Sequence, residues 1–82
     1  MTNVFTNNVE INKLVAKFDR DSNTFIVLIG RVPALEFSGD GVNRVRCMKA
    51  FAKNRSWFHK QILNVLNVPN YVVPNPFQPQ EA

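Results

Sequence analysis

The segment of residues 42–68 contains no glycine and no proline. Apolar side chains recur there at three- and four-residue spacing, the pattern of a helix that packs one face against a core. The apolar positions are Val45, Met48, Phe51, Ala52, Phe58, Ile62, Val65 and Leu66. We therefore expect one long helix, continuous or bent, of about 40 Å at 1.5 Å per residue.

Arg55 interrupts the apolar face of this predicted helix, and His59 lies beside it. A short turn near Arg55, with Ser56 capping a second helix, is the alternative. Arg55 and His59 are expected to reach solvent along their aliphatic parts. Otherwise the apolar face is itself an interface, where Arg55 pairs with an acid such as Glu36 or with a partner chain.

Residues 24–29 are β-branched or aromatic and end at Gly30, which predicts a strand covered on both faces. Pro33 restricts the next alternating segment, residues 34–37, to the edge of a sheet. The polar residues 38–41 then offer Asp40 as the N-cap of the long helix.

Residues 9–18 fit two patterns. Ile11, Leu14, Val15 and Phe18 share a helical face, and this favours an amphipathic helix. The same segment also fits a strand, followed by a polar hairpin loop over residues 19–23. We prefer the helix.

Four of the five prolines lie between Pro69 and Pro79. This composition predicts an extended, mobile arm of polyproline type over residues 69–82 rather than a packed element. Its apolar residues either attach it to the domain or await a partner. The expected fold is thus α+β, with one domain over residues 1–68 in which a short hairpin or sheet packs against the basic helix.

Charge is divided unevenly along the chain. Residues 1–40 hold four basic and five acidic side chains, whereas residues 41–82 hold six basic side chains and Glu81 alone as an acid. The formal net charge is +4. This asymmetry indicates a nucleic acid, an anionic lipid surface or an acidic protein as the partner.

The basic side chains gather on one arc of the predicted helix, about 80° wide at 100° per residue. That arc holds Arg46, Lys49, Lys53, Ser56, Lys60, Asn64 and Asn67. A solvated helix face normally mixes both signs of charge, and this one has no acid to pair with its cations. The arc therefore predicts a binding surface.

Further residues complete the predicted contact set. Arg44 and Arg55 add positive charge. Trp57 at the rim of the arc covers the edge of the core, stacks on a base or anchors a protein interface. The amides of Gln61, Asn64 and Asn67 are candidates for contacts with base edges.

No enzyme constellation is present in the sequence. His59 is the single histidine, and no Ser, Cys or Asp is spaced to form a catalytic set with it. One Cys and one His do not make a structural zinc site, and residues 19–30 lack the Gly and Glu of a calcium loop. Helix capping explains residues 38–41 better than a phosphate loop does. We expect no cofactor and no metal.

The longest uninterrupted apolar run, residues 25–29, is far shorter than the roughly 20 residues of a membrane-spanning helix. The first eight residues lack the features of a secretory signal. A cytoplasmic location without membrane insertion is therefore the expectation.

Three hypotheses of function follow. The first is a small non-enzymatic regulator whose basic helix face binds nucleic acid. The second is a modulator or inhibitor that docks on an acidic protein surface through the same face. The third is a structural subunit that forms a homodimer through the apolar helix face around Phe58.

Overall fold

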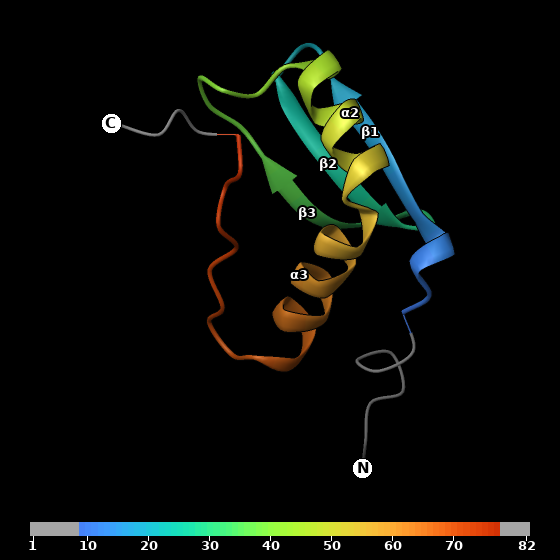
Figure 1. The fold of residues 1–82 in the computed structure, drawn as a ribbon. Coiled ribbons are helices and arrows are strands. Elements are labelled where there is room, and N and C mark those ends of the chain that lie inside the picture. Colours follow the sequence, from blue (N-terminus) through green and yellow to red (C-terminus); the bar gives the residue numbers. More distant parts are fainter. Residues whose placement is uncertain (1–8, 78–82) are drawn as a thin grey trace.

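One antiparallel sheet and two helices make up the α+β fold of this protein, seen in a computed structural model that describes residues 9–77. The strands are β1 (Leu14–Asp19), β2 (Thr24–Ile29) and β3 (Val32–Phe37), in the spatial order β1-β2-β3. A 3₁₀ turn, η1 (Ile11–Lys13), precedes β1. Helices α2 (Arg44–Lys53) and α3 (Arg55–Asn67) follow β3 and lie against the same face of the sheet (Figure 1).

The preference for a helix over residues 9–18 is wrong, and the alternative of a strand is confirmed. β1 pairs with β2 from Leu14 opposite Ile29 to Asp19 opposite Thr24. This pairing satisfies the edge of β2 that a helix over residues 9–18 would leave unpaired, and it turns alternate side chains of β1 toward the core. The polar loop that follows is a turn in which the Asp19 carboxylate accepts hydrogen bonds from the backbone N–H of Asp21 and the hydroxyl of Ser22.

The strand over residues 24–29 is confirmed, but only one of its faces is covered by the helices. Phe25 and Val27 point into the core and are fully buried, whereas Ile26 and Leu28 on the other face are half-buried. The edge position of β3 is also confirmed. Its register with β2 shifts at Val27 and Leu28, next to Pro33, where a missing N–H is tolerated at a sheet edge.

The long helix is two helices separated by Asn54. Asn54 has φ −126° and ψ 42°, which is not helical, and its carbonyl accepts a hydrogen bond from Trp57 N–H at 2.9 Å. The preference for a continuous helix is therefore wrong, and the alternative of two helices is confirmed. The break comes before Arg55, however, and Ser56 is not the capping residue.

The predicted N-cap at Asp40 is also wrong. The side chain of Asn43 caps α2, because its Oδ1 accepts a hydrogen bond from Arg46 N–H at 2.8 Å. Asp40 lies earlier, in an exposed turn that Val42 N–H closes onto Gly39 O at 3.1 Å. Asn caps a helix as well as Asp does, so the residue type alone does not distinguish position 43 from position 40.

Phenylalanine side chains join the elements of the core. The Phe25 ring on β2 contacts the rings of Phe37, Phe51, Phe58 and Phe77, with centroids 5.8–6.4 Å apart. These partners come from β3, α2, α3 and the C-terminal segment respectively. Aromatic pairs at such separations add to the stabilisation that burial alone gives.

The core-facing side of α2 differs from the predicted one. Cys47 and Phe51 are buried, whereas Val45 is 62% exposed and Ala52 is exposed. On α3, Phe58 and Ile62 are buried as predicted, but Val65 and Leu66 lie at the margin. Contact with the sheet selects the side of α2 around Cys47 and Phe51, a choice that spacing along the helix does not specify.

The C-terminal segment is packed on the domain, which corrects the expectation of a mobile arm. Phe77 is 1% exposed and lies among Phe25, Phe37 and Phe58. Asn75 donates a hydrogen bond to Ser38 O at 3.1 Å, and its own Oδ1 accepts one from Phe77 N–H. The predictions for residues 1–8, which lack a secretory signal, and for the end of the proline-rich arm, residues 78–82, lie outside the described residues.

Gly41 allows this close approach. A Cβ atom at position 41 would lie 1.5 Å from the carbonyl oxygen of Phe77. Any other residue there would displace the backbone of the C-terminal segment, so glycine is required at this crossing.

We expect Phe77→Ala to lower the free energy of unfolding by about 3 kcal/mol, because a buried ring is replaced by a cavity in the aromatic core. Val72→Ala in the same segment is the matched control, since Val72 is 83% exposed. Urea unfolding followed by Trp57 fluorescence measures both. Equal stability of the two variants would show that the segment does not contribute to the core.

Candidate functional site

Four cations form the basic strip, defined as Arg46, Lys49 and Lys53 of α2 with Lys60 of α3. All four are exposed. The three on α2 follow one another at three- and four-residue spacing, on the side of the helix opposite Cys47 and Phe51. Lys60 occupies the corresponding outward side of α3, because Phe58 and Ile62 face the core.

The charges of the basic strip are not neutralised within the domain. Over residues 9–77, no Lys or Arg side chain forms an ion pair with an Asp or Glu. Arg46 is held at one point, where its Nη1 donates a hydrogen bond to Gly41 O at 3.2 Å. The strip therefore presents cations that an anion can approach directly.

Arg44 lies beside the strip. It is exposed at the start of α2 and lines a shallow hollow of about 250 Å³ together with Val45, Met48 and Lys49. Basic and apolar groups thus share this flank of α2.

The polar residues of the predicted arc differ in exposure and in hydrogen bonding. Ser56 is exposed and Asn64 is half-buried. The Asn67 amide donates a hydrogen bond to Leu63 O at 2.7 Å. The expectation that Gln61 meets a base edge is wrong, because Gln61 is buried and its Oε1 accepts a hydrogen bond from the Tyr71 hydroxyl.

Arg55 lies on the other side of the helices from the strip. Its Nη1 donates hydrogen bonds to Leu14 O at 3.2 Å and to Ile11 O at 3.4 Å, and its guanidinium lies 4.7 Å from the centroid of the Phe51 ring. Both earlier expectations for Arg55, a solvent-directed side chain and a pair with Glu36, are therefore wrong. It ties η1 and the start of β1 to the helices.

His59 has the same structural role. Its Nε2 lies 2.6 Å from Val9 O, so the tautomer with the proton on Nε2 donates a hydrogen bond to the chain before η1. Two side chains that interrupt the apolar pattern thus satisfy backbone carbonyls of the N-terminal segment.

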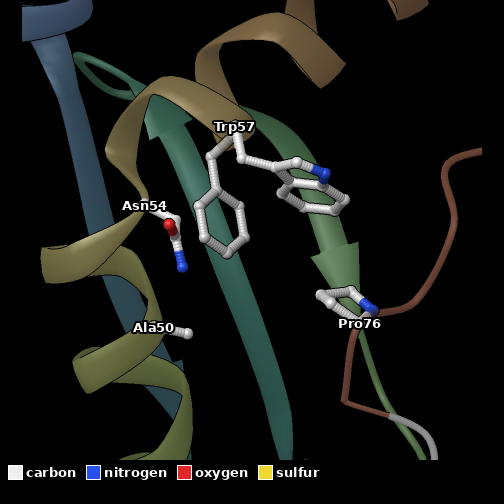
Figure 2. Close-up of a pocket in the computed structure, with 5 residues that line it drawn as sticks. Ala50, Asn54, Trp57 and Pro76 are labelled. Carbon is white, nitrogen blue, oxygen red and sulfur yellow. The ribbon is translucent and has the colours of Figure 1, made fainter.

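Trp57 sits between the core and solvent. Its indole packs edge-to-face on Phe58, with ring centroids 4.9 Å apart, and contacts Phe37 at 6.5 Å, so it is partly buried against the core. It also lines a hollow of about 280 Å³ with Ala50, Asn54, Phe58 and Pro76. Figure 2 shows the indole of Trp57 on α3 and the Pro76 ring on the C-terminal segment, with Asn54 at the junction of the two helices.

The walls of this hollow are mainly carbon, from the indole, the Phe58 ring and the proline ring. Asn54 supplies an exposed amide at one side, and its chain neighbour Lys53 belongs to the basic strip.

Cys47 is a free, fully buried thiol. Burial raises the pKa of this thiol above its usual value, although the backbone hydrogen bond at Asn43 and the charge of Arg46 act in the opposite direction. The protonated thiol acts here as a small core residue.

Phe58, at the centre of the helix face predicted for self-association, is 1% exposed and packs in the core, so it is not available to a second chain. Val45, Val65 and Leu66 of the same predicted face are exposed, and the homodimer hypothesis stays a prediction. Within residues 9–77, neither helix has the length and apolar character to cross a membrane.

The chain matches no protein-family model, and comparison with curated proteins and with solved structures found no similar protein.

We expect Arg55→Met to lower the free energy of unfolding by about 1–3 kcal/mol, because two carbonyls lose a charged donor. Lys53→Met, at an exposed position two residues away, should change it by less than about 0.5 kcal/mol. Urea unfolding of both variants measures the difference. A stable Arg55→Met protein would return Arg55 to the list of candidate binding residues.

Proposed function

We propose that this protein is a small non-enzymatic binding module whose basic strip engages nucleic acid, as a regulator would. The observation that carries the proposal is the exposure of Arg46, Lys49, Lys53 and Lys60 without any acidic partner in residues 9–77. Such a row contacts phosphates, and the released counterions favour binding.

The dimensions of the strip suit a chain of phosphates. From Arg46 to Lys60 the two helices advance about 20 Å at 1.5 Å per residue, which spans several nucleotides. Arg44 extends the row at the start of α2. One long row of cations fits a linear polyanion better than a single small anion.

The hollow at Trp57 favours a single strand. Bases of duplex nucleic acid are stacked on one another, whereas an unpaired base can stack on the indole. Asn54 would meet the edge of that base, and Lys53 would hold its phosphate. The strip supplies affinity and the hollow supplies preference for unpaired bases.

The rival function is docking on an acidic protein surface through the same strip. Like nucleic-acid binding, this docking would depend on Lys49 and Lys53. It differs because an acidic protein surface needs no base-sized stacking site beside the cations. Loss of acidic-protein binding on charge reversal, with no affinity for any polynucleotide, would favour this rival.

We expect the protein to bind a labelled single-stranded oligonucleotide of about 15 nucleotides at about 50 mM salt. Four phosphate contacts give a slope of log affinity against log salt of about −3 on a single strand. Lys49→Glu should weaken binding about tenfold, because one attraction becomes a repulsion. Lys17→Glu makes the same charge change on β1, away from the helices, and should have little effect.

Fluorescence anisotropy over a salt series measures both variants against the parent protein. Absence of binding to DNA and RNA at low salt would overturn the proposal. Equal weakening by Lys49→Glu and Lys17→Glu would show that net charge, and not the strip, determines affinity.

We expect Trp57→Leu to lower affinity for a single strand about tenfold while the salt slope stays unchanged, since base stacking is worth about 1–3 kcal/mol and involves no phosphate. Trp57→Phe retains a ring and should recover most of the loss. Quenching of the indole fluorescence on binding is the direct readout in the parent protein. An unquenched indole with unchanged duplex and single-strand affinities would exclude the hollow from the site.

A further inference from the structure

The sheet has a second face, which the helices do not cover. We define the outer sheet face by side chains that alternate with the core residues: Val15, Lys17 and Asp19 on β1, Thr24, Ile26 and Leu28 on β2, and Pro33 and Glu36 on β3. The Asp19 carboxylate is held by the turn after β1, where it accepts hydrogen bonds from Asp21 N–H and the Ser22 hydroxyl. The core residues Phe25, Val27, Leu35 and Phe37 alternate with them. By the period of a strand, the two sets point to opposite faces.

The outer sheet face is apolar at its centre. Ile26 and Leu28 are half-buried by their neighbours, Val15 is 48% exposed and Pro33 is exposed. Strands with one solvated face usually place polar residues on it. Apolar side chains at the centre of an open face therefore indicate a surface that another surface covers.

Two opposite charges flank this apolar centre. Lys17 pairs with Ile26, and Ile26 pairs with Glu36, so one row across the sheet reads cation, apolar, anion. Both charged residues are exposed, and neither forms an ion pair within the described part of the chain. In the neighbouring row, Val15 pairs with Leu28 and Leu28 with Pro33, which is apolar throughout.

We propose that the outer sheet face binds the same face of a second copy of this chain. A two-fold axis parallel to β2 places Lys17 of each copy opposite Glu36 of the other. Ile26 then meets Ile26, Leu28 meets Leu28, and Val15 meets Pro33. The face is complementary to itself in both charge and apolar pattern.

The charges also select this arrangement over the other face-to-face one. A two-fold axis perpendicular to the strands, through the row of Ile26, places Lys17 on Lys17 and Glu36 on Glu36. Like charges in contact oppose association. Aligned packing of two sheets, with the strands nearly parallel, is one of the two geometries that sheets adopt.

The contact area indicates a weak dimer. Three strands of six residues cover about 20 Å by 15 Å, which places the total buried area below about 1,200 Å². Interfaces of this size are typical of transient association. The helices lie on the other face of the sheet, so dimerisation leaves the basic strip free.

Sedimentation of the full chain between about 10 µM and 1 mM tests the proposal, over the range in which a small interface associates. The parent protein should shift from monomer toward dimer as concentration rises, and Ile26→Glu should remain monomeric. Ile26 is outside the core, and the unfolding midpoint of the variant verifies that it folds. A parent protein that stays monomeric up to about 1 mM would overturn the proposal.

A charge swap tests the arrangement itself. Lys17→Glu and Glu36→Lys should each weaken dimerisation about tenfold, since each places like charges opposite one another. The double variant restores opposite charges across the interface and should recover the parent dimerisation constant. Failure of the double variant to recover, or dissociation only with variants of the helix face, would place the contact elsewhere and overturn the proposal.

Discussion

Packing around the Phe25 ring is the interaction on which the other features of this structure depend. This side chain of the central strand contacts rings from β3, α2, α3 and the C-terminal segment. A sheet of three short strands is marginal by itself, and it needs a covered face for stability. Phe25 and its partners supply that cover, and they determine which side of each helix faces inward. The C-terminal segment is part of this arrangement because Phe77 completes the cluster.

The residues that each helix turns toward the sheet determine which of its residues are exposed to solvent. Once Cys47, Phe51, Phe58 and Ile62 face the sheet, the cations of the basic strip are left on the exposed sides of the two helices, together with exposed apolar residues such as Val45, Val65 and Leu66. The buried residues Cys47, Phe51, Phe58 and Ile62 follow one another at spacings of four, seven and four across the break, so the outward side keeps the same helical phase in both helices. The basic strip therefore continues from α2 to Lys60 although the helix does not. No acid from the described strands reaches it, since β1 to β3 lie behind the helices.

Periodicity and composition predicted the α+β class, the central strand, the edge strand and the outward cations. They did not decide residues 9–18, because that segment satisfies both a helical and a strand pattern, and only pairing with β2 distinguishes them. Arg55 and His59 interrupt the apolar pattern of the helix, which predicts side chains that reach solvent or lie in an interface. Their partners are backbone carbonyls far away in the sequence, which no local pattern reveals. The burial of Phe77 was missed because proline-rich composition describes the backbone of a segment and not the attachment of one ring.

The two proposed surfaces lie on opposite sides of the sheet, and this has a consequence for binding. In the proposed dimer the outer sheet faces meet about 10 Å apart, and each helical layer adds about 10–12 Å beyond its sheet. The two basic strips would then face away from each other, separated by about 30–35 Å across the dimer. A short strand bound on one strip cannot reach the other, so dimerisation would not raise affinity for it by linking two sites. The dimer would instead bring two separate strands, or two distant parts of one strand, together.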